Sequence, residues 1–314
     1  MRRGIRALPL AAALLAMLTL AGPAAPQAVT AGAAATARTA ALTAATATGD
    51  CDPNVGPRSR PPSLDESGPG VQAIKKRGML LAGIDLSSYR WGSRNPNDNR
   101  PEGFDIDLVR AIAKAILGDP DKVQFKVIPM KRRQEALDND EIDLMARTIT
   151  ITCDRAAVTP FSTVYFQAGQ QVVVPRSAKA TSVDGAIKGK TVCVADSSTA
   201  QAQMNLNRRG AAAVTVADNA LDCLVRMQLG QADVTLTDNA VAVGQAAQDP
   251  TVEVIGPSIT SEPYGIAMPL RWPDLVARVN QVLVDYRKDG WQASYDKWLA
   301  PYLGPTNGPP PIGP

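Results

Sequence analysis

The sequence predicts an α/β protein with parallel sheets and covering helices, because short apolar strands alternate with amphipathic helices along most of the chain. The clearest helix is GFDIDLVRAIAKAILGDP, residues 103–120, which places residues such as Ile106 and Ile112 on one face before Gly118 and Pro120 stop it. Strand-like runs include GMLLAGID, EIDLMA, GKTVCVA and ADVTLT. About 250 such residues form either one large sheet or two lobes, and periodicity alone does not choose between them.

Both ends of the chain differ from this body. Three arginines precede an uncharged stretch rich in Leu and Ala, so we expect residues 1–28 to be an export signal that is cleaved or kept as an anchor. Residues 29–50 are rich in Ala and Thr without periodicity, which is typical of a linker, and residues 304–314 form a tail rich in Pro and Gly. The folded body should lie between Cys51 and Leu303.

Charge and composition exclude several classes of function. The chain has 33 Lys and Arg against 30 Asp and Glu, and loss of the export signal removes three arginines and no acid. The near-neutral remainder argues against binding to nucleic acid. The absence of histidine excludes Ser-His and Cys-His nucleophile pairs and His-ligated metals, so we expect no enzyme, no cofactor and no metal. A lyase or dehydratase would have to rely on Asp85 and Asp238.

Polar residues follow the predicted strands at equivalent places, their carboxyl ends. These are the positions at which open α/β sheets bind ligands. The residues are Asp85, then Thr148, Thr150 and Arg155, then Ser198 and Thr199, and finally Asp238.

These residue types suit a ligand that carries both charges. Arg155 can hold a carboxylate by two parallel hydrogen bonds, and the hydroxyls of Thr150 and Thr199 can add to it. Asp238 can accept an ammonium, so an α-amino acid satisfies the set. On sequence alone, Arg155 could instead pair with a surface acid, and Asp238 could cap a helix.

The order of several stretches resembles a known family. GIDLSSYRWG, TITITCDR, FSTVYFQAGQ, DCLVRMQLGQADVTLTDN and SEPYGIAMP, with the helix described above, are similar to the family 3 extracellular solute-binding proteins of polar amino-acid ABC transporters. Within that family they resemble the actinobacterial glutamate/glutamine-binding branch, over about residues 64–303. The resemblance implies a bilobal periplasmic-binding-protein type II-like fold, in which two α/β lobes are joined by two hinge strands.

The resemblance also implies boundaries and roles. Lobe 1 would comprise residues 51–168 and 263–303, and lobe 2 residues 169–262, with hinges at 165–169 and 262–265. Arg155 matches the carboxylate-binding arginine, Thr150 and Thr199 its hydroxyl partners, and Asp238 the ammonium acceptor. Further cleft positions fall at Thr148, Ser198, Asp85 and Tyr89.

Cationic residues near these positions bear on the choice of ligand. Arg90, Arg147 and Lys131 would place positive charge near the ligand side chain, which favours glutamate or aspartate, with glutamine next. The partner would be the membrane subunits of an ABC permease or, as the alternative, a membrane receptor kinase that uses the same ligand as a signal. We expect a monomer.

Four cysteines in an exported chain, without a C-x-x-C motif, indicate disulfides more than a metal site. In the lobes that the resemblance implies, Cys193 pairs with Cys223 and Cys51 with Cys153, because this connectivity needs no bond across the cleft. Asp50 precedes Cys51 where a lipoprotein signal has small apolar residues, so we expect no lipid anchor.

Overall fold

The computed structural model of the protein describes residues 51–52 and 56–311. The expected export signal and linker, residues 1–50, lie outside the described residues. None of the helices in the described part has the length and apolar character required to cross a membrane.

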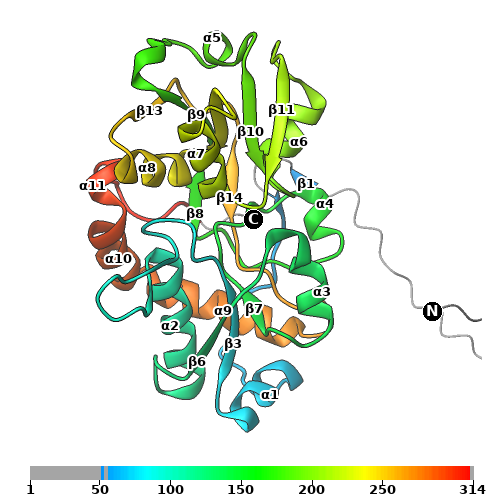
Figure 1. Ribbon diagram of the computed structural model, residues 1–314. Helices are drawn as coiled ribbons and strands as arrows, with labels where there is room; N and C mark the ends of the chain where they lie inside the picture. Colours follow the sequence, from blue (N-terminus) through cyan, green and yellow to red (C-terminus); the bar gives the residue numbers. More distant parts are fainter. Residues whose placement is uncertain (1–50, 53–55, 312–314) are drawn as a thin grey trace, which may run out of the picture. The chain divides into compact units, whose positions relative to one another are not determined.

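The first sheet is parallel, and its three strands come from the N-terminal half of the described chain (Figure 1). Its strand order is β6 (Val123–Val127), β3 (Leu80–Ile84) and β7 (Leu144–Met145). The helices that belong with this sheet and its core are α1 (Pro69–Arg77), α2 (Phe104–Leu117), α3 (Arg133–Asp138), α9 (Pro273–Tyr286), α10 (Gly290–Trp298) and α11 (Ala300–Leu303).

Helix α2 shows how the sequence builds this part. Its apolar residues, Ile106 and Ile112 among them, are buried in the core, and Gly118 ends the helix in the left-handed conformation at φ 75°. A short 3-10 turn, η1 (Met130–Arg132), precedes α3, and a hairpin of β4 (Ser93–Arg94) and β5 (Pro101–Glu102) precedes α2.

The second sheet is mixed, whereas the sequence predicted parallel sheets. Its order is β11 (Ala213–Ala217), β10 (Thr191–Ala195), β12 (Val234–Asp238), β9 (Gln170–Pro175) and β13 (Val252–Ile255), and β9 runs antiparallel to both of its neighbours. Its own core lies beneath η2 (Arg176–Ala178), α5 (Val183–Ile187), α6 (Thr199–Leu206), α7 (Ala220–Gln228) and α8 (Asn239–Gln248).

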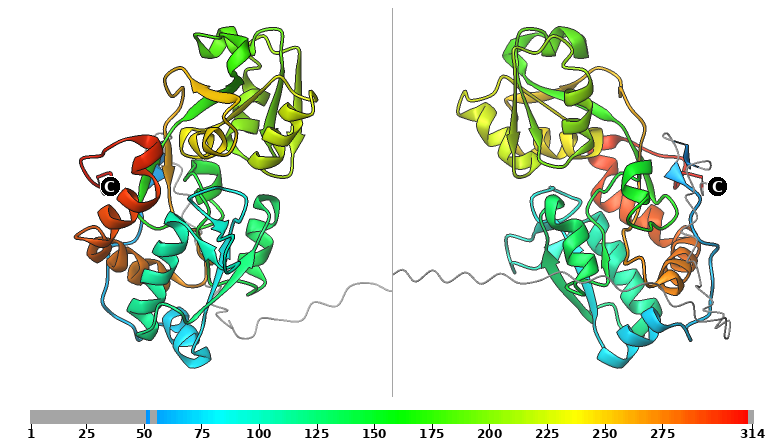
Figure 2. Two further views of the ribbon diagram at one scale, coloured as in Figure 1. Left: turned by 60° about the vertical axis from the view of Figure 1, so that its left-hand side comes forward. Right: turned by 90° about the vertical axis from the view of Figure 1, so that its right-hand side faces the viewer.

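Two antiparallel strands connect the sheets, β8 (Phe166–Ala168) and β14 (Glu262–Tyr264), where hinge segments were expected (Figures 1 and 2). Gly169 lies so close to the second crossover that a Cβ there would be 2.5 Å from the carbonyl oxygen of Thr260. Only glycine permits that approach without a shift of backbone. The fold is therefore a bilobal α/β fold with two crossover strands.

Both disulfides join the pairs that the resemblance implied. Cys193 and Cys223 are fully buried and link β10 to α7. Cys51 lies in β1 (Cys51–Asp52), which pairs with β2 (Gly56–Pro57), and its bond to Cys153 ties this N-terminal hairpin to the short helix α4 (Cys153–Ala156).

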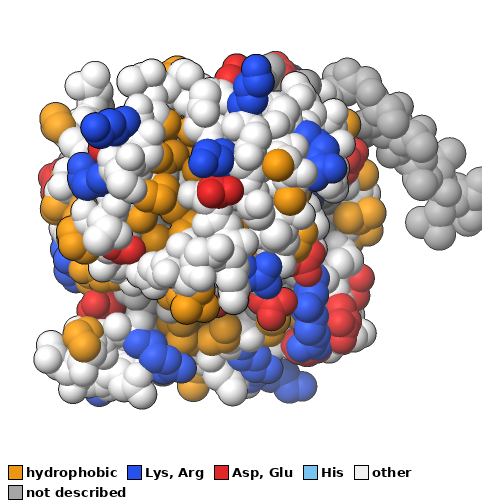
Figure 3. Space-filling view, turned by 45° about the horizontal axis from the view of Figure 1, so that its top comes forward, with side chains coloured by type: hydrophobic (Ala, Val, Ile, Leu, Met, Phe, Trp, Pro, Cys, Tyr) orange, Lys and Arg blue, Asp and Glu red, His pale blue; other side chains and the backbone are white. Residues whose placement is uncertain are grey.

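The face drawn in Figure 3 carries basic and acidic side chains interspersed with one another. No broad basic stripe lies on that face, which agrees with the near-neutral charge of the chain beyond the export signal.

Candidate ligand-binding site

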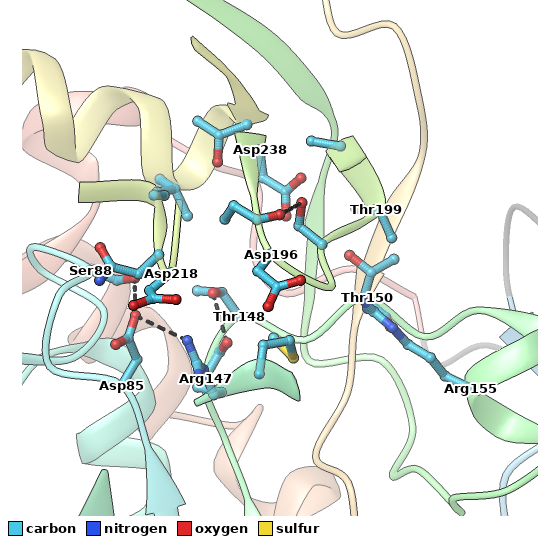
Figure 4. A pocket seen from close by; sticks show the side chains of 18 residues that line it. Asp85, Ser88, Arg147, Thr148, Thr150, Arg155, Asp196, Thr199, Asp218 and Asp238 are labelled. Carbon is cyan, nitrogen blue, oxygen red and sulfur yellow. Dashed lines mark hydrogen bonds and ion pairs between the residues drawn. The ribbon is translucent and has the colours of Figure 1, made fainter. Parts of the chain in front are cut away.

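A pocket of about 70 Å³ lies where the carboxyl ends of β3, β7, β10 and β12 meet (Figure 4). The structure brings together in its lining eight of the eleven residues that the sequence placed near the ligand. These are Asp85, Arg147, Thr148, Thr150, Arg155, Ser198, Thr199 and Asp238.

Arg155 reaches across this pocket from helix α4. Thr152 caps α4, because its hydroxyl accepts the backbone N–H of Arg155 at 3.2 Å. The guanidinium donates from Nη1 to the carbonyl oxygen of Thr150 at 2.8 Å and from Nη2 to that of Ser197 at 2.9 Å. Burial, with the nearby charge of Arg133, lowers the pKa of Arg155 to about 10, so it stays cationic at neutral pH.

Ser197 and Ser198 shape the loop that faces Arg155. Ser197 has φ 58°, a left-handed conformation that glycine adopts more readily than other residues. The hydroxyl of Ser198 accepts the N–H of Gln201 and donates to the carbonyl oxygen of Ala195, so it caps α6. Thr199, the first residue of α6, lines the pocket beside it.

Asp238 ends β12 and precedes α8, but its carboxylate does not cap that helix. Instead it accepts the phenol O–H of Tyr264 at 2.6 Å. Burial, and then the negative charge of Glu262, raise the pKa of Asp238 to about 7. The carboxylate is therefore available to a cationic group, and the capping alternative does not hold.

Asp85 and Arg147 form an ion pair on the far side of the pocket from Arg155 and Thr150 (Figure 4). Arg147 Nη2 lies 3.6 Å from Asp85 Oδ2, and Ser88 donates to the same oxygen at 2.6 Å. Burial alone would raise the pKa of Asp85, but Arg147 and the hydrogen bonds from Ser88 and Ser87 outweigh it and lower the pKa. Asp85 is thus ionised at neutral pH.

Comparison with known proteins identifies the family. Residues 80–301 match the bacterial extracellular solute-binding proteins, family 3. The chain belongs to this family. The family is described as extracellular, in agreement with the predicted export, and the expected signal itself lies outside the described residues.

Similar proteins include the ABC transporter glutamine-binding protein GlnH of Bacillus subtilis, 35% identical over 230 residues, or 73% of this chain and 84% of the relative. The glutamine-binding protein of Geobacillus stearothermophilus is 39% identical over 198 residues, 62% of this chain and 74% of the relative. Among solved structures, an ancestral arginine-binding protein bound to glutamine matches with a TM-score of 0.64 and 34% identity, over 73% of this chain and 99% of its own.

Tyr89 and Arg90 were predicted for the ligand site of this family 3 protein, but neither side chain lines the pocket. Arg90 has φ 70°, and its guanidinium carbon lies 4.8 Å from the ring centre of Tyr89 and 5.6 Å from that of Tyr302. The left-handed turn at Arg90 directs Tyr89 and Arg90 toward the C-terminal helices α10 and α11. There, Arg90 Nη2 donates to the hydroxyl of Tyr302 at 3.4 Å.

The sequence did not single out Asp105, which supports the pocket from behind. Asp105 is buried in the first turn of α2 and accepts the N–H of Thr148 at 2.9 Å and the O–H of Tyr165 at 2.8 Å. It holds Thr148 at φ 50°, the turn that directs the segment after β7 into the pocket. An acid in the first turn of a helix is an ordinary companion of the helix dipole, so the sequence offered no signal of this role.

The pocket lining contains four aspartates, because Asp196 and Asp218 join Asp85 and Asp238. Among the residues that the structure describes, no three acidic or cysteine side chains lie close enough together to hold a metal ion. Two arginines, Arg147 and Arg155, complete the charged lining.

Proposed function

We propose that the protein captures a single polar α-amino acid and hands it to an ABC importer. The observation that carries this proposal is that Arg155 and Asp238, which have opposite charges, line the same pocket. Thr150 and Thr199 line it with them. Arg155 would bind the α-carboxylate together with the two hydroxyls, and Asp238 would accept the α-ammonium.

The size of the pocket supports one amino acid and not a peptide. A volume of about 70 Å³ is small beside the roughly 300 to 1,000 Å³ of pockets that hold drug-sized ligands. With the α-carboxylate at Arg155, the side chain would extend toward the Asp85–Arg147 pair on the far side (Figure 4).

This ion pair favours a carboxamide side chain. Asp85 presents a hydrogen-bond acceptor and Arg147 a donor, and Arg147 Nε is buried without a hydrogen-bond partner in the described structure. An amide can donate to Asp85 and accept from Arg147 at the same time, whereas a carboxylate would be repelled by the ionised Asp85.

The three cations on which the preference for an acidic ligand rested already have partners within the protein. Arg90 stacks on aromatic rings outside the pocket, and Lys131 lies 3.6 Å from Asp218. Arg147 is paired with Asp85, which leaves a lining of four aspartates and two arginines. We therefore place glutamine ahead of glutamate and aspartate, the reverse of the order that the sequence suggested, and the glutamine-binding relatives support this order.

Capture would involve closure of the two lobes about β8 and β14. Contacts between the lobes support a closed state: Trp91 Nε1 donates to the carbonyl oxygen of Ala240 at 3.0 Å, and Arg155 reaches Ser197. Small-angle scattering with and without ligand tests closure, because an open ligand-free form would be less compact. An unchanged radius of gyration would contradict it.

A thermal-shift panel of the twenty amino acids tests the function itself. At ligand a hundredfold above its Kd, linkage contributes about 2.7 kcal/mol, which raises the Tm of a domain of this size by roughly 5 to 10 °C. We expect glutamine to give the largest shift, and no shift with any amino acid would overturn the proposal. Asp85→Asn should move the preference toward glutamate, since it removes the repelling charge.

Transfer to a permease is distinguished from sensing by a direct assay. Ligand-loaded protein should stimulate the ATPase activity of its ABC permease in vesicles, and the relative named as part of an ABC transporter supports this role. Binding to a receptor kinase without stimulation of any permease would favour the sensing alternative.

A further inference from the structure

The second hinge strand, β14, carries two side chains that bear on Asp238. Glu262 and Tyr264 are two residues apart and so lie on the same face of the strand. Both are buried, Glu262 at 3% exposure and Tyr264 at 0%. Tyr264 contacts Asp238 directly, because its hydroxyl donates to Asp238 Oδ2 at 2.6 Å.

Glu262 is only half satisfied by hydrogen bonds. Its Oε1 accepts from Gln170 Nε2 at 2.9 Å and from Thr260 Oγ1 at 2.7 Å, but its buried Oε2 has no hydrogen-bond partner in the described structure. Gln170 stands directly opposite Asp238 in the ladder between β9 and β12. Glu262 is therefore a second carboxylate placed just behind the residue that would receive the ligand's ammonium.

The groups that face Asp238 act in opposite directions. Burial and the charge of Glu262, from β14, favour the protonated acid; the hydrogen bond from Tyr264 and the charge of Arg155, from α4, favour the carboxylate. Asp238 directly precedes α8, and the positive end of a helix dipole also favours a carboxylate. The balance leaves the pKa of Asp238 at about 7, so the ligand-free protein carries a mixture of both forms near neutral pH.

We propose that Glu262 and Tyr264 determine how many protons the protein releases when Asp238 takes up the ammonium group of the ligand. The inference rests on the proposed function. It states that binding of the ligand is accompanied by release of a proton from Asp238. In the protonated fraction, the acid proton of Asp238 passes to solvent, and the ligand N–H groups then donate to the resulting carboxylate. No covalent bond of the ligand changes.

The direction of the pH dependence follows from this exchange. Binding requires ionised Asp238, so lowering the pH through its pKa protonates the site and weakens binding. With a ligand-free pKa of about 7 and an ionised bound form, affinity at pH 6 should be about tenfold weaker than at pH 8. At pH 7 the protein should release about half a proton per ligand bound.

Calorimetric titration with glutamine in buffers of different ionisation enthalpy measures this proton release. Glu262→Gln removes the negative charge behind Asp238, and if it lowers the pKa by about one unit, the affinity ratio between pH 8 and pH 6 falls to about twofold. Tyr264→Phe removes the hydrogen bond that favours the carboxylate, so it should move the pH profile upward and increase proton release at pH 7.

Glu253→Gln is the matched control, because Glu253 is also a strand glutamate, in β13, but pairs with Arg176 at 3.1 Å and does not line the pocket. Glu253→Gln should leave unchanged both the affinity ratio between pH 8 and pH 6 and the number of protons released at pH 7. Burial also raises the pKa of Asp105 to about 7, and the charges that act on it are those of Asp85 and Arg147. Any proton that Asp105 releases on binding would therefore still be released in Glu262→Gln.

Each outcome decides the matter. Wild-type affinity that is equal at pH 6 and pH 8, with heats independent of buffer, would overturn the inference, as would an unchanged pH profile in folded Glu262→Gln. If Glu262→Gln does not fold, the wild-type buffer series and Tyr264→Phe provide the same test. A protein that binds none of the amino acids at any pH would instead overturn the proposed function.

Discussion

Replacement of Arg155 by alanine should abolish most of the affinity for the ligand while leaving the fold intact. Of the two arginines that line the pocket, Arg155 is the one placed to meet the α-carboxylate in the proposed pose, since Arg147 is paired with Asp85. Its removal leaves a carboxylate in a closed pocket without its partner.

The magnitude follows from the geometry of Arg155. Loss of one partner of a buried charge pair costs about 2 to 5 kcal/mol, or roughly thirtyfold to several thousandfold in Kd. Without ligand, the variant also loses two hydrogen bonds, to the carbonyl oxygens of Thr150 and Ser197, but it no longer buries a cation whose pKa burial lowers to about 10. These effects oppose each other, so the Tm without ligand should change by no more than about 4 °C.

Isothermal titration of glutamine into wild type, Arg155→Ala and Arg155→Lys measures the effect. Lysine keeps the charge but lacks the planar pair of donors, so Arg155→Lys should recover only part of the affinity. Arg100→Ala is a suitable control, because Arg100 is 77% exposed and lies 3.9 Å from Asp98 on the surface. Its Kd should match that of the wild type.

Wild-type affinity in folded Arg155→Ala would refute the reasoning. It would mean that Arg155 serves only to join the segment after β7 to the loop after β10 through its two carbonyl contacts. In that case Arg155→Ala should lower the Tm without ligand and leave Kd unchanged, the opposite of the pattern predicted.

Three further predictions concern neighbouring groups. Thr150→Val should weaken binding by about 0.5 to 3 kcal/mol in the same titration, because one hydroxyl contact to a charged group is lost; an unchanged Kd would remove Thr150 from the ligand contacts. Arg90→Ala should leave Kd within about threefold of the wild type, since Arg90 lies outside the pocket, and a larger loss would restore it to the site. Mild reduction should open the half-buried Cys51–Cys153 disulfide before the fully buried Cys193–Cys223 bond and should weaken binding by loosening α4. Mass mapping of the reduced thiols, with Kd at each stage, checks the order, and unchanged affinity after the first reduction would contradict the effect on α4.

The sequence by itself determined the local elements and the places where chemistry could gather. Helical periodicity over residues 103–120 predicted α2, Phe104–Leu117, because an apolar face repeats wherever a helix covers a sheet. The sequence also placed Asp85, Arg155 and Asp238 at or after the carboxyl ends of strands, the positions at which open α/β sheets bind ligands, and all three line the pocket. These features depend on spacing along the chain, which a single sequence contains.

Contacts between distant segments were decided only by the tertiary structure. Glu262 meets Gln170, 92 residues away, and Tyr264 meets Asp238, 26 residues away, so nothing local marked β14 as a neighbour of Asp238. Arg90 was expected in the pocket, but a left-handed turn sends it to Tyr302, 212 residues along the chain. Side-chain direction and the charge felt by a carboxylate depend on which elements pack together, and that packing is a property of the whole fold.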